Sequence, residues 1–290
     1  MLAIRGRRVA CALAIWGVPL VSNVGSGEEL DSEHLFGFTE GTDIGAKGDK
    51  ELELEGFGAF GKGRGAYSAV AAGVEGKFTI LDNFRVSPGL GVAHHNISGV
   101  PGLADRNSTN FEGVSLEMKY RLLDRRHAGV GVTIGVTPAW ARVDDTSGEP
   151  VDSQGVGLLF STDYALVPGW VLTAFNMTYD LAATRSHITG EWSHDSLFGV
   201  SGAIAGQVMQ NVFLGAEVRY ARAYGGLALD HFDGHALFVG PTAYAKFPNG
   251  AWISAAWNAQ VAGRSIEVPA ALDLTNFPHH EVIVRFGQPF

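Results

Sequence analysis

The sequence predicts an all-β protein: a single transmembrane antiparallel up-and-down β-barrel of about 12 strands. Three observations support this prediction. Apolar and polar residues alternate along most of the chain after residue 50. Short and long connections alternate between these runs. The composition combines 39 glycines, 17 phenylalanines, 7 tyrosines and 6 tryptophans with only 18% charged residues. A membrane-spanning barrel has such a composition because every second side chain of each strand faces lipid.

The clearest alternation runs from Val114 to Leu122. Valine, leucine, methionine, tyrosine and leucine at the even positions alternate with serine, glutamate, lysine and arginine at the odd positions. Successive side chains of a strand point to opposite faces, so this segment has one apolar and one polar face. About twelve such runs occur, an even number, as expected when both chain ends lie on one side of the membrane. We expect strands near 51–62, 66–80, 84–96, 111–123, 128–145, 153–167, 170–186, 192–209, 212–226, 235–247, 251–266 and 279–290.

The connections between these runs differ in length. Tight turns are expected at 81–83, 124–127, 168–169, 210–211 and 248–250, and long loops at 97–110, 146–152, 186–191, 227–234 and 267–278. Outer-membrane barrels have short periplasmic turns and long extracellular loops. A soluble β-sandwich or lipocalin-like barrel is the alternative, with its charged face outward. The length of the strands argues against it, as do aromatic residues near strand ends, such as Trp140, Trp170 and Tyr220.

The first 27 residues have the features of a secretory signal peptide. Three arginines within the first eight residues precede an apolar run over 9–24, and small residues follow. A short membrane anchor is the alternative. Cys11, the only cysteine, lies in this segment, so the mature chain would have no disulfide and no thiol chemistry. Without the three arginines, 18 basic residues would face 30 acidic ones, which disfavours nucleic acid as a partner.

Residues 28–50 form an acidic segment between the signal peptide and the predicted barrel of 51–290. We assign this segment to the periplasm. Two placements remain open there, because the segment could fill the lumen of the barrel or extend away from it.

The last predicted strand resembles the C-terminal signature of Gram-negative outer-membrane proteins. The residues that carry this resemblance are Val282, Val284, Phe286 and Phe290. The resemblance implies the cell outer membrane as location, outer-membrane lipid as surroundings, and the barrel-assembly machinery as a partner that reads these residues. The segments EHLFGFTEG (33–41), VPGLADR (100–106), GHALFVGPT (234–242) and LDLTNF (272–277) are similar to uncharacterised outer-membrane proteins of rhizobia and their relatives.

Charged residues of both signs lie on the polar faces of the predicted strands. A charged constriction could select solutes. Alternatively, interlocking ion pairs could hold the shape of a narrow barrel and seal it. The residues expected to line the lumen are Glu75, Lys77, Glu117, Lys119, Arg121, Asp163, Asp180, Glu217, Arg219, Glu281 and Arg285.

One predicted outer loop contains both histidine and carboxylate residues. The motif DHFDGH places Asp230, His231, Asp233 and His235 within six residues. Imidazole and carboxylate groups together suit zinc, copper or nickel. The same residues also fit ordinary loop polarity, and the spacing matches no strict metal motif. No cofactor is expected.

The sequence favours a passive channel or uptake protein for small polar solutes. The alternative is a closed barrel with a structural or surface-interaction role. A more remote alternative is a hydrolase resembling outer-membrane phospholipase, which would need a nucleophile oriented by a base and a third group. Ser161 and Asp163 share a face, but no histidine lies on that stretch. We therefore expect no enzymatic activity.

Overall fold

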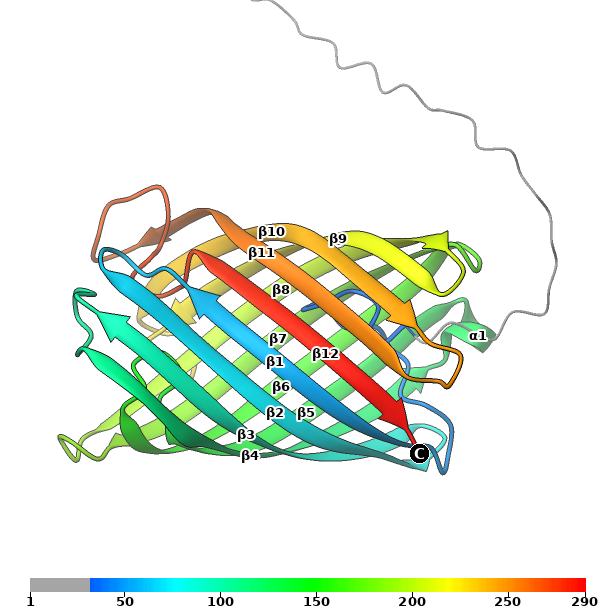
Figure 1. Cartoon of the computed structure of the whole chain (residues 1–290), viewed down its shortest axis with the longest axis horizontal. Coiled ribbons are helices and arrows are strands. Elements are labelled where there is room, and N and C mark those ends of the chain that lie inside the picture. Colours follow the sequence, from blue (N-terminus) through cyan, green and yellow to red (C-terminus); the bar gives the residue numbers. More distant parts are fainter. Residues whose placement is uncertain (1–31) are drawn as a thin grey trace, which may run out of the picture.

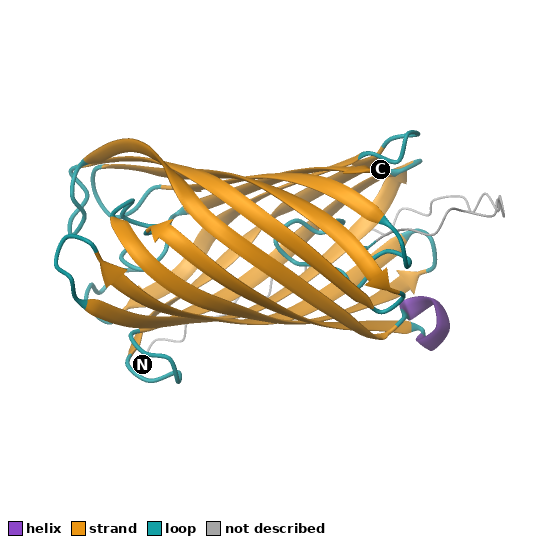
Figure 2. Ribbon diagram, turned by 90° about the horizontal axis from the view of Figure 1, so that it is seen from below, coloured by secondary structure: helices purple, strands orange, loops and turns teal. Residues whose placement is uncertain are grey.

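The computed structural model describes residues 32–290, which form a closed antiparallel barrel of twelve strands (Figures 1 and 2). The predicted signal peptide, 1–27, lies outside the described residues. Each strand pairs with its neighbours in sequence, and the first strand pairs with the last to close the sheet. The predicted fold class is confirmed.

The strands correspond closely to the predicted runs. Their bounds are β1 Lys50–Phe60, β2 Ala66–Leu81, β3 Phe84–Ser98, β4 Arg106–Leu123, β5 Val130–Val143, β6 Pro150–Val167, β7 Val171–Ser186, β8 Trp192–Met209, β9 Val212–Tyr224, β10 Phe232–Lys246, β11 Trp252–Ser265 and β12 His280–Pro289.

One helix, α1 (Arg125–Ala128), replaces the tight turn expected at 124–127. Asp124 caps its first turn by accepting a hydrogen bond from the backbone N–H of Arg126, and Gly129 ends it with a φ of 79°. Among the described residues, no helix is long and apolar enough to cross a membrane.

The two ends of the barrel differ, and we name them by their connections. The turn end carries α1, the start of β1 and the end of β12 (Figure 1). The loop end carries the connections 61–65, 99–105, 144–149, 187–191, 225–231 and 266–279. The expected loop at 97–110 is shorter than predicted, because β3 and β4 stay paired as far as Ile97 and Arg106. The polar run 106–110 lacks apolar alternation, and so its strand character was missed.

The faces of the sheet are reversed relative to a soluble barrel. On β1, Leu52 and Leu54 are 44% and 49% exposed, whereas Glu53 between them is 5% exposed. The wall therefore points apolar side chains outward and polar side chains inward, as a barrel in lipid does. This arrangement contradicts the soluble alternative.

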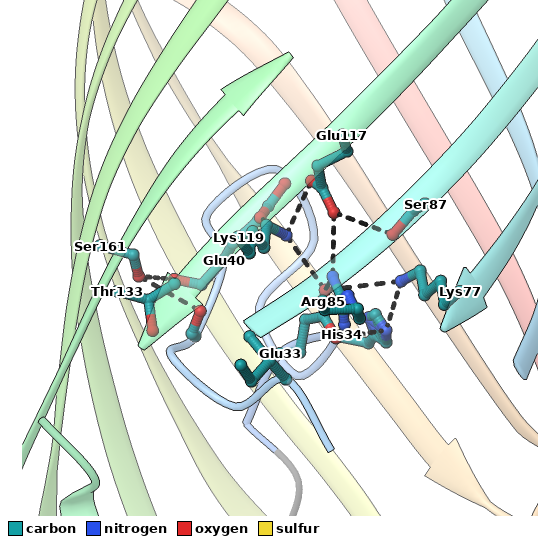
Figure 3. A network of polar contacts seen from close by, with 12 residues as sticks. Glu33, His34, Glu40, Lys77, Arg85, Ser87, Glu117, Lys119, Thr133 and Ser161 are labelled. Carbon is teal, nitrogen blue, oxygen red and sulfur yellow. Dashed lines mark hydrogen bonds and ion pairs between the residues drawn. The ribbon is translucent and has the colours of Figure 1, made fainter. Parts of the chain in front are cut away.

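Residues 32–44, which we call the plug, lie inside the barrel in the half next to the turn end (Figure 3). Ser32, Phe36 and Thr39 have no exposed surface. The chain then reaches β1 through an exposed turn at 45–49. The assignment of 28–50 to the periplasm is thus wrong for residues 32–44, and the lumen-filling alternative is the observed one. The physical reason is that inward-facing polar groups of the wall need partners, which the plug provides.

Candidate functional site: a plugged lumen

All eleven charged residues predicted to line the lumen belong to its inner face. Six are buried: Lys77, Lys119, Arg121, Asp163, Glu217 and Glu281. Three border internal cavities: Glu75, Glu117 and Asp180. Two form ion pairs with other inner carboxylates: Arg219 and Arg285. Their placement is observed, and their role in selectivity stays a prediction.

The centre of the site is a network that we call the Glu33 cluster: Glu33 of the plug with Lys77, Arg85, Glu117 and Lys119 of the wall (Figure 3). Both terminal nitrogens of Arg85 donate to the Glu33 carboxylate. Lys119 Nζ lies 3.0 Å and Lys77 Nζ 3.5 Å from Glu33 Oε1. Glu117 accepts from Arg85 at 2.9 Å and pairs with Lys119 at 2.9 Å. Three cations from three adjacent strands thus converge on one carboxylate of the plug.

The charge state of this cluster follows from its surroundings. Burial by itself raises the pKa of Glu33, but Arg85, Lys77 and Lys119 together lower it well below its usual value. Burial, reinforced by Lys77, lowers the pKa of the neighbouring His34 well below its usual value. Glu33 is therefore ionised, and His34 is neutral. Neutral His34 lies with its Nε2 2.9 Å from Lys77 Nζ and stacks on Trp252 with ring centroids 3.9 Å apart.

A second ionic anchor holds the plug near α1. Arg125 Nη2 donates to Asp43 of the plug at 2.9 Å, and its Nη1 donates to Asp163 of β6 at 2.6 Å. The Ser32 hydroxyl lies within hydrogen-bonding distance of both carboxylates and can donate its single proton to either. Here the arginine bridges a plug carboxylate and a wall carboxylate, so the two acidic groups do not face each other unpaired.

Wall side chains also satisfy the backbone of the plug, which has no regular secondary structure. Glu217 accepts from the N–H groups of Phe38 at 3.3 Å and Thr39 at 2.9 Å. The Asn176 amide accepts from the Glu40 N–H at 2.7 Å and donates to the Glu40 carbonyl at 2.8 Å. Further donors to plug carbonyls are Ser161 to Glu40 and Gly41, Thr133 to Thr42, Thr79 to Ile44 and Arg285 to Gly37. Buried backbone groups require such partners.

Leu35 and Phe36 form the main apolar anchor of the plug, and Ile44 is a further buried apolar side chain, 1% exposed. Leu35 and Phe36 are 1% and 0% exposed and pack in a cluster with Leu172, Phe213 and Trp252. The chain passes close to the wall just after them. Gly37 has a φ of 90°, and a Cβ at this position would lie 2.4 Å from Ala256 Cβ. A glycine is therefore needed here both for its conformation and for its size.

Three cavities lie along the lumen, and the second and third of them border the plug. One of about 320 Å³ is lined by Glu53, Glu55, Glu75 and Glu112, among other residues. A second, of about 390 Å³, is bordered by Glu40, Glu117 and Asp180. A third, of about 350 Å³, is bordered by Glu33, Lys77 and Arg85 and extends to turn-end residues, including Phe290. The Glu33 cluster stands between the second and the third cavities, so it separates the two halves of the lumen.

Loops cover the opposite end of the lumen. Phe277 of loop 266–279 packs on Phe238 and Ala236 of β10. The Tyr67 hydroxyl donates to the Thr146 carbonyl of loop 144–149 at 3.1 Å. The loop end is therefore closed by loops folded inward rather than by the wall itself.

The predicted metal motif does not form a converging set of ligands. Asp230 and His231 lie in an exposed loop, with His231 Nε2 3.8 Å from Asp230 Oδ2, while Asp233 and His235 lie on β10. His235 stacks instead on the ring of Phe232. Asp233 and His235 share the outward face of β10, whereas Asp230 and His231 lie in the loop before the strand, and no three of the four side chains bring ligand atoms together.

Within residues 32–290, one other group has suitable geometry for a cation: His34, Glu51 and Glu53. Lys77 already lies among them, with Nζ 2.6 Å from Glu53 Oε2 and 2.9 Å from His34 Nε2. The ammonium group supplies the positive charge there, and we assign no metal site to it.

The predicted assembly residues lie on the last strand as expected. Val284 and Phe286 point outward and are 41% and 38% exposed; Val282 is partly exposed. Phe290 is 72% exposed, and its N–H donates to the Lys50 carbonyl at 3.1 Å. Recognition of these residues by the barrel-assembly machinery stays a prediction.

Several residues of the site were missed from the sequence. Glu53 alternates with Leu52 and Leu54, so the period-two pattern of β1 could have identified it. Arg85 and Ser87 alternate in the same way at the start of β3. Glu33 could not be found by this signal, because the plug has no periodicity.

A closed up-and-down barrel with an apolar exterior and a polar interior is the architecture of outer-membrane barrels. Two solved structures share the fold. An outer membrane channel from Pseudomonas putida F1 aligns with a TM-score of 0.57 at 12% identity, over 86% of this chain and 98% of that one. The beta domain of the Bordetella autotransporter BrkA aligns with a TM-score of 0.54 at 12% identity, over 84% and 100%.

The family model places the chain more narrowly. Residues 28–290 match a family of unknown function (DUF6662), and the chain belongs to this family. The match includes the plug as well as the barrel. No curated protein matches the chain.

Proposed function

We propose that the protein is a gated channel of the outer membrane, in which the plug closes a lumen that passes small polar solutes. Its apolar exterior and its fold support residence in that membrane, and so does the resemblance of 33–41 and other segments to rhizobial outer-membrane proteins. The observation that carries the proposal is the polar nature of the contacts between plug and wall. A segment held mainly by hydrogen bonds and ion pairs can leave, because water then takes its place at the wall.

The free energies of the individual contacts between plug and wall support a plug that can move. A hydrogen bond exchanged for water changes stability by only about 0.5–1.5 kcal/mol. The apolar contribution comes from Leu35, Phe36 and Ile44, and each such side chain adds roughly 1.5–3 kcal/mol when fully buried. Departure of the plug would hydrate a wall rich in serine, threonine, asparagine and charged groups. The cavities on both sides of the plug would then join and fill with water.

The second candidate is a permanently closed barrel with a structural or surface-interaction role. The buried Leu35–Phe36 anchor and the loops at the opposite end favour it. Ion pairs such as Arg219–Glu281 at 2.7 Å, which fill part of the bore, also favour it.

We propose a role without enzymatic activity. The pair considered from the sequence, Ser161 and Asp163, is engaged by the plug: the Ser161 hydroxyl donates to the Glu40 carbonyl at 2.8 Å, and Asp163 pairs with Arg125 at 2.6 Å. A nucleophile of the hydrolase type would need a histidine in place of these partners.

A reducible lock tests the gate. The hydroxyls of Thr39 in the plug and Ser201 in β8 are 3.0 Å apart, so T39C/S201C places two thiols within reach of a disulfide. We would introduce this pair into an E33A background, in which the plug has lost its main ionic anchor. Conductance would be measured in planar bilayers, with E33A/T39C as the control.

We expect E33A to conduct, the oxidised lock to be silent, and reduction to restore conductance. The control should conduct under both conditions. If the reduced lock and E33A are both silent although folded, the channel is refuted in favour of the closed barrel. If the oxidised lock conducts as well as the reduced form, the plug is not the gate.

A further inference from the structure

The wall of the lumen contains a preformed set of cations around Glu33. Lys77, Arg85 and Lys119 are 6%, 3% and 3% exposed and come from β2, β3 and β4. Cations buried to this degree are costly unless they are paired. The plug supplies much of the pairing, through Glu33 and through Glu40, whose carboxylate is 2.6 Å from Lys119 Nζ.

The charge balance shows what the wall lacks without the plug. The wall carboxylates within ion-pair distance of the three cations are Glu53 and Glu117. Glu53 is also shared with Arg285, at 3.5 Å. At ion-pair distance, three wall cations therefore face two wall carboxylates, while Glu51 and Glu75 act on Lys77 only at longer range, and the plug supplies the remaining direct pairing.

The shape of the set favours a carboxylate over other anions. Arg85 directs two nitrogens at the two oxygens of Glu33, a fork that matches a planar carboxylate. Phosphate would bring more charge and a third oxygen close to Glu117, which already accepts from the same Arg85 nitrogen at 2.9 Å. Repulsion between these two anions would disfavour phosphate.

A solute can approach Lys77, Arg85 and Lys119 from the turn end of the barrel. The third cavity is lined by Arg85 and Lys77, and Lys50 and Lys246 line it toward the turn end. Its lining holds four lysine or arginine residues against three carboxylates, one of which is Glu33 itself. The cavity of about 320 Å³ is lined instead by four glutamates, so an anion would be repelled there.

We propose that Lys77, Arg85 and Lys119 form a binding site for the carboxylate of a small solute, and that Glu33 occupies this site as an internal ligand. A monocarboxylate that reaches the site from the turn side takes the place of Glu33 and weakens the plug. As a statement about the transported solute, this rests on the proposed channel. The binding site itself does not, because it can be measured without conductance.

Chemical rescue tests the site. E33A in the full-length protein removes the internal carboxylate and leaves space beside Arg85. We would follow thermal unfolding by circular dichroism in detergent, adding sodium acetate to one series and sodium chloride at equal ionic strength to another. Acetate should raise the midpoint of E33A by a few degrees in a saturable way, beyond the effect of chloride. Wild-type protein should not be stabilised by acetate relative to chloride, because Glu33 already occupies the site at a high effective concentration.

Three controls make the outcome decisive. E33A/R85M should lose the acetate effect, because the fork is gone. E33Q keeps the volume of the side chain and should not respond to acetate, since its amide fills the space. Sodium phosphate should stabilise E33A less than acetate does. Equal shifts in E33A and wild type, or a phosphate effect as large as that of acetate, would overturn the proposal.

The same series remains informative if E33A folds poorly. E33S retains a polar group, leaves most of the space open, and should show the acetate effect as well. A positive rescue in a barrel that never conducts would leave the site intact and refute only the transport role. Conductance in E33A without any rescue would refute the carboxylate site and leave the gate intact.

Discussion

The two halves of the lumen are closed in different ways. Next to the turn end, a segment of the chain fills the bore and is held by buried ion pairs from several strands, with Glu33 and Asp43 as its anchors. Next to the loop end, loops cover the bore and are held by two apolar clusters, one around Phe277 and one that includes Val100 and Leu103 of loop 99–105. The first closure depends on charge complementarity deep in the bore. The second depends mainly on apolar packing between the loops and the wall.

This difference predicts different responses to perturbation. A buried charge that loses its partner is strongly destabilising. A loop with few apolar contacts opens locally at little cost. The turn-end half should therefore respond to charge and pH, and the loop-end half should respond to local packing.

Reversing the charge of Arg85 should have the largest effect. R85E would place a third carboxylate beside Glu33 and Glu117, so we expect a loss of about 3–5 kcal/mol in the free energy of unfolding. Urea unfolding followed by tryptophan fluorescence would measure it. R126E is the matched control, because Arg126 lies at the same end in a partly exposed ion pair with Asp124. Similar losses in both variants would contradict a special role for the buried cluster.

Acidification should loosen the plug in two steps. His34 has a lowered pKa in the folded protein, so its contribution to stability is present above the unfolded value of about 6.5 and decreases as the pH falls below it. Glu33 also has a lowered pKa, so its contribution is present above about 4.3 and is lost toward the lower folded value. Unfolding free energies between pH 8 and pH 3 would show both steps.

Variants assign each step to its residue. H34Q should remove the decrease that begins near pH 6.5, and E33Q should remove the decrease below about pH 4.3. The unfolding free energy of H34Q should depend less on pH than that of wild type only in the region below about pH 6.5 where His34 titrates. That of E33Q should do so only below about pH 4.3. A pH profile that neither substitution changes would show that other groups control the plug.

The barrel could be predicted from the sequence because its signal is local. The alternation from Val114 to Leu122 sets the faces of β4 directly, and the turns that follow each run set the order of strands. The plug could not be predicted in this way. Its burial depends on partners such as Arg85, Asp163 and Glu217, which lie far away in sequence and meet only once the barrel has closed.

The metal prediction failed for a related reason. Asp230, His231, Asp233 and His235 are close in sequence, but two lie in the loop and two on β10, and no three of them bring their ligand atoms together. Proximity in sequence predicts well which side chains lie together on one face of a strand, where the period is two. It is a poor guide where a loop becomes a strand.

At the loop end, F277A should open the cover without affecting the plug. Phe277 is 7% exposed against Phe238, so its truncation should free loop 266–279. Limited proteolysis should cut this loop faster, while the midpoint of urea unfolding should change little. V268A is the control, because Val268 lies in the same loop and is 51% exposed. A large fall in the unfolding midpoint of F277A would show that the loop belongs to the cooperative core.

The smallest expected effect is on the ion selectivity of the open channel. It shows whether the glutamate-lined cavity or the cations near Arg85 control which ions pass. Glu75, Glu112, Glu53 and Glu55 border one cavity, so an open lumen should favour cations there. In an E33A background, E75Q/E112Q should shift the reversal potential in a salt gradient toward that of an unselective pore. E191Q, which changes an exposed loop residue, should leave it unchanged. An unchanged potential in E75Q/E112Q would mean that the cations near Arg85 dominate the open lumen. In that case the turn-end half would control which ions pass as well as whether the bore is closed.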